Sequence, residues 1–220
     1  MADAFAPPER IGFVGLGQMG APMARNLARA GFRLALLDAR PGAADAVGVD
    51  AARPADAADL GAACRVAITM LPDGRVVRDV VLGERGLASG LAAGSVVIDM
   101  SSSSPVGTRE LGAALAARGI ALIDAPVSGG VKRAIDGSLA IMAGGDAAVI
   151  ERCRPILAAM GGQIFATGPL GSGHAMKALN NYVSAAGLAA AAEAVLAGSR
   201  FGLDAETIVG ILNASTGRNN

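Results

Sequence analysis

The stretch Ile11-Gly12-Phe13-Val14-Gly15-Leu16-Gly17-Gln18-Met19-Gly20 joins an apolar run to the start of a helical pattern through three spaced glycines. Gly15 permits a tight turn, Gly17 lets the backbone approach a pyrophosphate, and Gly20 allows a helix to pack closely on a strand. The N-terminus of the following helix offers free N–H groups and a positive dipole end to phosphates. We therefore expect a dinucleotide-binding turn formed by Gly15, Leu16, Gly17, Gln18, Met19 and Gly20.

An acidic residue, Asp38, ends the second apolar run about 20 residues after the glycines, as this turn requires. A carboxylate at this point accepts hydrogen bonds from an adenosine ribose and repels a 2′-phosphate. The plain alternative is a turn residue, because Asp-Ala-Arg-Pro is also a turn pattern. Arg40 is able to hold a 2′-phosphate. We expect NAD as the cofactor, with NADP as the alternative.

Short apolar runs alternate with helical segments from residue 11 to residue 168. This alternation predicts an α/β fold of the Rossmann type, with a doubly wound, mainly parallel sheet covered on both faces. Residues 1–10 are expected to form a loose tail. The expected strands are 11–14, 33–37, 66–70, 96–99, 121–124, 139–143 and 163–165, and the expected helices are 19–30, 75–82, 106–117 and 147–160.

The character of the chain changes after Gly168. An Ala-rich helix is expected over 174–200, followed by a second helix over 205–213 that Asp204 caps. Two helices make a poor domain by themselves, because their apolar faces need partners. We interpret residues 169–220 as the beginning of an all-helical substrate and dimerisation domain. We expect either that the chain stops earlier than the natural protein or that another subunit covers these helices.

Composition narrows the functional classes. Nineteen basic residues balance nineteen acidic ones without a basic run, so we expect no nucleic-acid partner. Cys64 and Cys153 are the only cysteines and are expected to be reduced thiols, with no metal site. The Ala-rich stretch 183–198 is short for a membrane span and contains Glu193. We expect no membrane partner and a cytoplasmic location.

Four motifs in order resemble the β-hydroxyacid dehydrogenase family, which includes 3-hydroxyisobutyrate dehydrogenase and tartronate semialdehyde reductase. The resemblance covers the chain from Ile11 to its end. The first motif, residues 12–23, resembles the cofactor fingerprint, and the second, Asp99-Met100-Ser101-Ser102 with Pro105, has Ser102 where the family usually has Thr. The third, residues 124–130, is similar to the substrate-binding loop. The fourth, residues 171–181, is similar to the catalytic motif.

The resemblance implies a role for each motif. Lys177 is implied as the proton-transfer group that a hydride transfer requires, with Asn181 beside it as a hydrogen-bonding residue on the same helix face. Ser128, Gly129 and Gly130 are implied to bind a substrate carboxylate. The plain alternatives are a solvated lysine, a polar cap and an ordinary turn. The resemblance also assigns Met70, Leu71 and Pro72 to packing along the cofactor, and Ser102 to the nicotinamide ribose.

The expected function is hydride transfer between NAD(P) and a small 3-hydroxy acid or its semialdehyde, by a homodimer or homotetramer. An imine reductase-like enzyme is one alternative, against which Lys177 argues. A catalytically silent cofactor-binding scaffold is another. Lys132 and Arg133 either favour a more anionic or more hydroxylated substrate or form an exposed basic pair on a loop. His174 is interpreted as a helix-start residue.

Overall fold

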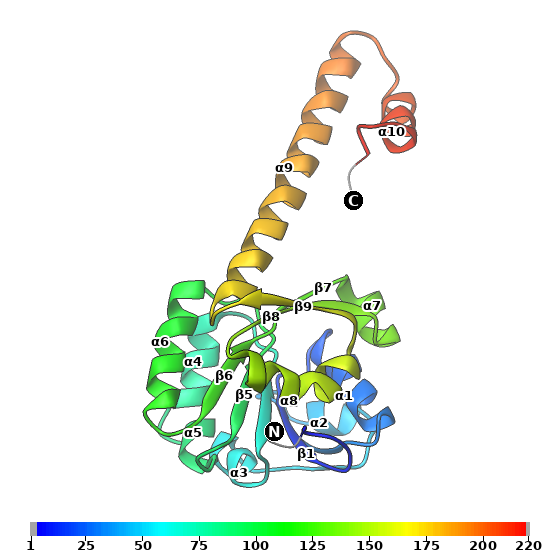
Figure 1. The fold of residues 1–220 in the computed structure, drawn as a ribbon. Coiled ribbons are helices and arrows are strands. Elements are labelled where there is room, and N and C mark those ends of the chain that lie inside the picture. Colours follow the sequence, from blue (N-terminus) through cyan, green and yellow to red (C-terminus); the bar gives the residue numbers. More distant parts are fainter. Residues whose placement is uncertain (1–3, 219–220) are drawn as a thin grey trace. The chain divides into compact units, whose positions relative to one another are not determined.

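The computed structural model describes residues 4–218 of the chain, drawn in Figure 1. The chain forms two compact units, Met1–Lys177 and Ala178–Asn220. The division falls after Lys177, within the fourth motif at residues 171–181.

The first unit is built on a nine-stranded sheet. Six strands run parallel in the order β3-β2-β1-β4-β5-β6, which is the order of a dinucleotide-binding Rossmann fold. The order reverses between β1 and β4, and this switch point is where such sheets bind ligands. The strands are β1 Arg10–Val14, β2 Arg33–Leu37, β3 Ala51–Ala52, β4 Val66–Thr69, β5 Val96–Asp99 and β6 Ala121–Asp124.

Three further strands extend the sheet beyond β6. Strand β8 (Leu139–Gly144) runs antiparallel to β6 and to the short β7 (Val127–Ser128), and β9 (Gly161–Gly168) runs parallel to β8. The mainly parallel character predicted from the sequence is therefore confirmed, with antiparallel pairing confined to this edge.

Helices cover both faces of the sheet, because alternate strand residues point to opposite sides. On one face, buried Ile11, Phe13 and Ile68 pack with side chains of α1 (Gly20–Arg29) and α8 (Ala147–Ala158). On the other face, buried Ala67 and Val97 pack with residues of the remaining helices. These are α3 Ala57–Ala62, α4 Gly74–Leu82, α5 Leu87–Gly90 and α6 Pro105–Ala116 (Figure 1).

Several short elements were not expected from the sequence: β3, β7, α2 (Ala43–Ala46), α3, α5 and α7 (Gly130–Asp136). Each is too short to carry a clear periodic pattern. The expectation of a loose N-terminal tail is also wrong for Phe5, which is buried and whose N–H donates to the carbonyl of Arg152. The Phe5 ring contacts the guanidinium groups of Arg65 and Arg152 and packs in the hydrophobic core.

The second unit contains most of helix α9 (Ser172–Arg200) and helix α10 (Ala205–Ala214). Asp204 caps α10 as predicted, since its carboxylate accepts a 2.9 Å hydrogen bond from the N–H of Thr207. By length and composition α9 is able to span a membrane. A core helix of a soluble protein can have the same length and composition, so these properties are weak evidence for a membrane span. The expectation that the segment is too short to span a membrane does not hold, because the helix has 29 residues.

Candidate active site

The glycine-rich turn after β1 has the tight geometry that its sequence predicts. Gly15 has a positive φ of 95°, and a Cβ added there would lie 2.2 Å from the carbonyl oxygen of Met70. A Cβ on Gly20 would lie 1.9 Å from the carbonyl oxygen of Gly15. A Cβ on Gly17 would meet no atom within 4 Å. Close backbone contacts within the protein therefore require glycine at positions 15 and 20. Gly17 makes no such contact and leaves an open space at the N-terminus of α1.

A cleft of about 840 Å³ opens beside this turn. Met70, Leu71 and Pro72 follow β4 and line the cleft, so both sides of the switch point contribute to it. The predicted cofactor residues that line this cleft are Gly15, Gly17, Gln18, Met19, Gly20, Asp38, Met70, Leu71 and Pro72. Leu16 and Ser102 are not among the lining residues; Leu16 is buried and Ser102 is exposed.

Asp38 is joined to the glycine turn at the rim of the cleft. Its Oδ2 accepts a 2.6 Å hydrogen bond from the N–H of Leu16, and its Oδ1 accepts hydrogen bonds from the N–H and Nε of Arg40. Burial raises the pKa of Asp38, but the hydrogen bonds from Arg40 and Leu16 outweigh it and lower the pKa overall. Arg40 also donates to the carbonyl of Leu16, which places a cation beside the carboxylate.

These features fit a dinucleotide. The open space at Gly17, next to the N-terminus of α1 and its positive dipole end, has the character of a pyrophosphate site. The carboxylate of Asp38 has the chemistry to accept ribose hydroxyls. Within residues 4–218, no cluster of three or more His, Cys, Asp or Glu residues could hold a metal ion.

Lys177 lies in the first part of α9 and is half-buried. Burial lowers its pKa, because removing an ammonium group from water disfavours its charged form. Asn181 follows one helical turn later on α9 and is exposed. The two residues therefore have the spacing predicted for one helix face.

The third motif forms the end of β7 and the start of α7. Ser128 is half-buried, while Gly129 and Gly130 have positive φ angles of 128° and 66° and are exposed. A Cβ on Gly130 would meet no atom within 4 Å, so the backbone is open to solvent at this point. Lys132 and Arg133 were expected on a loop, but Gly130–Asp136 is helical and places this exposed pair on α7.

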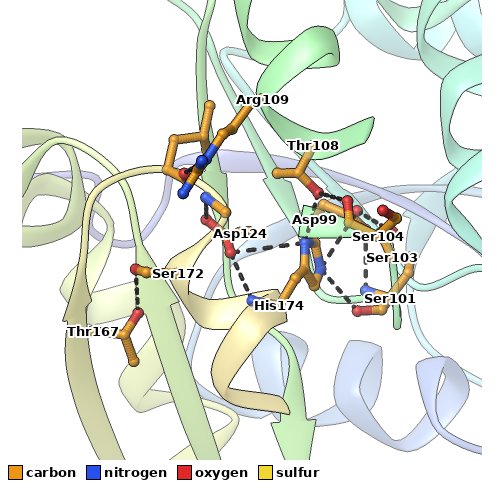
Figure 2. Close-up of polar contacts among 12 residues, drawn as sticks. Asp99, Ser101, Ser103, Ser104, Thr108, Arg109, Asp124, Thr167, Ser172 and His174 are labelled. Carbon is orange, nitrogen blue, oxygen red and sulfur yellow. Dashed lines mark hydrogen bonds and ion pairs between the residues drawn. The ribbon is translucent and has the colours of Figure 1, made fainter. Parts of the chain in front are cut away.

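A buried polar cluster at the ends of β5 and β6 holds the first turn of α9 (Figure 2). The Asp124 carboxylate accepts 2.8 Å hydrogen bonds from the N–H groups of Gly171 and His174. The His174 ring, 1% exposed, lies with Nδ1 2.8 Å from Thr108 Oγ1 and Nε2 3.1 Å from the carbonyl oxygen of Ser101. Lys177 therefore follows a turn that is fixed to the sheet.

The interpretation of His174 as an ordinary helix-start residue missed this cluster. The sequence feature that could have indicated this cluster is the position of Asp99 and Asp124, because each ends a strand within a motif. No local pattern, however, shows that His174 lies between two strand ends far away in the sequence. Such a contact depends on the tertiary fold.

Two family models match the chain. The NAD-binding domain of 6-phosphogluconate dehydrogenase matches residues 10–168, and the NAD-binding domain of NADP-dependent 3-hydroxyisobutyrate dehydrogenase matches residues 171–220. The chain is 42% identical to an NAD-dependent L-serine dehydrogenase of Pseudomonas aeruginosa, over 96% of this chain and 71% of the relative. A structure of Mycobacterium tuberculosis 3-hydroxyisobutyrate dehydrogenase with L-serine superposes with a TM-score of 0.87 and 38% identity, over 96% of this chain and 72% of that one.

The parallel sheet, the glycine turn and the matching models define an NAD(P)-binding oxidoreductase. The chain belongs to the β-hydroxyacid dehydrogenase family, and within it to the NAD(P)-dependent hydroxyacid dehydrogenases. An imine reductase of Myxococcus stipitatus also superposes, with a TM-score of 0.84 over 94% of this chain and 71% of that one. Its identity is 17%, so this likeness extends to the fold alone.

Proposed function

We propose that the protein transfers a hydride between NAD(P) and a small 3-hydroxy acid or the matching semialdehyde, with Lys177 as the proton-transfer group. The observation that carries this proposal is the half-buried amine of Lys177, whose pKa is lowered by burial and which follows a helix turn fixed to the sheet. A lowered pKa suits a group that must both accept and donate a proton near neutral pH.

The bound nicotinamide supplies or accepts the hydride. During oxidation the neutral Lys177 amine would take the proton from the substrate hydroxyl while the hydrogen on the same carbon leaves as hydride for the cofactor, so that a C=O bond forms. During reduction the ammonium form of Lys177 returns a proton to the developing alkoxide. Asn181, one turn further along α9, donates a hydrogen bond that orients the substrate oxygen.

The Ser128-Gly129-Gly130 segment binds the substrate carboxylate in this proposal. The exposed backbone of Gly129 and Gly130 offers N–H groups, and Ser128 adds a hydroxyl. L-serine is a 3-hydroxy acid, and it is named for the Pseudomonas relative and in the M. tuberculosis structure. We therefore include L-serine among the candidate substrates.

The remaining properties follow from the same proposal. We expect NAD to be preferred, since Asp38 lies at the ribose side of the turn with its pKa lowered. Ser102, exposed after β5, is proposed to contact the nicotinamide ribose, and Leu16 to contribute its backbone to the cofactor site. We also expect a cytoplasmic homodimer or homotetramer with no nucleic-acid or membrane partner. Exposed apolar residues such as Leu188, Phe201 and Ile211 favour assembly.

The test is a screen of the protein against 3-hydroxy acids and semialdehydes, each with NAD and NADP, followed by the absorbance of the reduced nicotinamide. L-serine, 3-hydroxyisobutyrate and a cyclic imine form the core of the panel. Turnover of a 3-hydroxy acid supports the proposal. Turnover of the imine alone would favour the imine reductase alternative, and cofactor binding with no turnover would favour the scaffold.

A further inference from the structure

We infer that His174 is a doubly protonated imidazolium held between the carboxylates of Asp99 and Asp124, and that this buried charge positions Lys177. The positioning role rests on the function proposed above for Lys177. The protonation state does not, because it follows from the hydrogen bonds of the ring alone.

The first ring nitrogen must carry a proton. The hydroxyl of Thr108 donates its single proton to the carbonyl oxygen of Ser104, 2.9 Å away. Thr108 Oγ1 also lies 2.8 Å from His174 Nδ1. A hydroxyl has one proton and the Ser104 carbonyl oxygen can only accept, so we assign that proton to the bond with Ser104 and Nδ1–H of His174 as the donor to Thr108 Oγ1.

The second ring nitrogen must carry a proton too. His174 Nε2 lies 3.1 Å from the carbonyl oxygen of Ser101, and a carbonyl oxygen only accepts hydrogen bonds. Both nitrogens therefore donate, and an imidazole ring that donates from both nitrogens is positively charged.

Two buried carboxylates surround this charge. Asp99 Oδ2 lies 3.7 Å from Nε2, and Asp124 Oδ2 lies 3.7 Å from Nδ1. Asp99 accepts hydrogen bonds from the hydroxyls of Thr69 and Ser103 and from the N–H of Ser101, at distances of 2.8–3.0 Å. Asp124 accepts hydrogen bonds from two backbone N–H groups. Both carboxylates act only as acceptors in these contacts, as ionised carboxylates do.

No other described cation pairs with these carboxylates. Among residues 4–218 the ion pairs of Asp99 and Asp124 are with His174 alone. Arg109, the charged neighbour on α6, is exposed and donates to the carbonyl of Leu170. Buried charges persist in proteins when they are paired and hydrogen-bonded, so the two acids require the imidazolium.

The same contacts connect the cofactor cleft to Lys177. The N–H of Leu71, which lines the cleft, donates a 2.9 Å hydrogen bond to Ser101 Oγ, and the carbonyl of Ser101 accepts from His174. Lys177 follows His174 by three residues, so the two lie on neighbouring positions of one helix face. A displacement of about 1 Å in a reacting group is able to cost about a hundredfold in rate. His174 is thus a positioning residue that fixes the helix turn preceding Lys177.

The sequence contains a single histidine, which makes the protonation state directly observable. We would label tag-free protein with ¹⁵N-histidine and record ring nitrogen–carbon proton correlations at pH 7. The expected spectrum is that of an imidazolium, with both nitrogens protonated. A spectrum with one protonated and one bare nitrogen would overturn the inference, whether or not the enzyme turns over a substrate.

Variants then test the positioning role. In Asp124→Asn one carboxylate charge is lost, so we expect the neutral ring to become detectable at pH 7. We also expect kcat to fall about tenfold to a hundredfold while the Kd for the cofactor is retained. Asp136→Asn, at the exposed end of α7, is the matched control and should alter neither measurement. An Asp124→Asn enzyme with a wild-type spectrum and wild-type kcat would contradict the inference.

Different results would refute the proton-transfer role of Lys177 and the charged state of His174. Wild-type turnover by a Lys177→Met enzyme would refute the function proposed for that lysine and, with it, the positioning role of His174. The imidazolium spectrum would be unaffected by that outcome. A neutral His174 in an enzyme that needs Lys177 would refute only the inference made here.

Discussion

The N–H of Leu16 donates a 2.6 Å hydrogen bond to Oδ2 of Asp38 and so joins the glycine turn after β1 to the end of β2. Two strand ends that flank the cleft are thereby held together by one carboxylate. The hydrogen bonds on Asp38 lower its pKa against the effect of burial, so the group is charged throughout the working range of an enzyme. A negative charge at this point opposes a 2′-phosphate.

Replacing Asp38 by Ser should therefore shift the preference of the enzyme from NAD towards NADP. The charge that repels the 2′-phosphate disappears, and Arg40 is released from its hydrogen bonds with the carboxylate. We expect the ratio of kcat/KM for NAD over NADP to fall at least about tenfold, or about 1.4 kcal/mol. Asp45→Ser, which removes an exposed acid outside the cleft, is the control. An unchanged ratio in Asp38→Ser would remove Asp38 from the cofactor site.

Alanine at Gly20 should affect stability, whereas alanine at Gly17 should affect cofactor binding. A Cβ on Gly20 overlaps the carbonyl oxygen of Gly15, so we expect Gly20→Ala to lower the free energy of unfolding by about 1–3 kcal/mol. A Cβ on Gly17 meets no protein atom, so Gly17→Ala should keep its Tm but weaken cofactor binding. Thermal melts and cofactor titration by fluorescence measure the two effects. Wild-type cofactor affinity in Gly17→Ala would show that the pyrophosphate lies elsewhere.

Both thiols should be unreactive in the folded protein. Burial raises the pKa of Cys64 to about 11 and that of Cys153 to about 12, from an ordinary value of 9.0. The thiolate is the reactive form, so a rise of two units lowers the rate of Cys64 with a disulfide reagent about a hundredfold. We expect both thiols to react at pH 8 far more slowly in the native protein than after denaturation. Rapid labelling of the native protein, assigned with Cys64→Ser, would contradict the buried placement.

The pH dependence of turnover should reflect the lowered pKa of Lys177. Oxidation needs the neutral amine, so kcat for oxidation should rise with pH through a pKa below the usual range of lysine, and kcat for reduction should fall. The sequence holds two lysines, Lys132 and Lys177, so NMR of the reductively ¹³C-methylated protein measures the titration directly. Lys132→Arg assigns the signals. A Lys177 signal that titrates as a free lysine does would contradict the prediction.

The free energy of unfolding should also depend on pH through the lowered pKa of Lys177. A lysine whose pKa is lowered on folding makes the folded state less stable wherever the group is charged, and stability recovers as pH rises from the folded towards the unfolded pKa. Below that window Lys177 therefore costs folding free energy. Its replacement by an apolar residue of similar length should leave the Tm unchanged or raise it.

The Rossmann sheet could be predicted from the sequence because its central strands are short apolar runs, such as Val66–Thr69, that alternate with amphipathic helices. The glycine turn was equally visible, since its three glycines have fixed spacing after a strand. The antiparallel edge was not visible. Strand β7 has only two residues, and its pairing with β8 depends on the chain reversal after Asp124.

The candidate site residues could be named from the sequence, but the buried hydrogen bonds that hold the start of α9 could not. Lys177 and Ser128 were named because each lies in a motif that resembles the family, and Asp38 because of its spacing from the glycine turn. The role of Asp124 as a cap for α9 requires contacts between residues 47 and 50 positions apart in the sequence, which no local pattern records. His174 does lie in the first turn of α9, but its burial between two strand ends could not be predicted, because that is a property of the folded chain.

Replacing Lys177 by Met removes the group proposed to transfer the proton. Lys177→Met keeps the length of the side chain and removes the amine, so turnover of the best 3-hydroxy acid from the screen should fall by about two to four powers of ten. The Kd for the cofactor and the Tm should not fall with it. A Lys177→Met enzyme whose kcat stays within a few-fold of wild type would contradict the account.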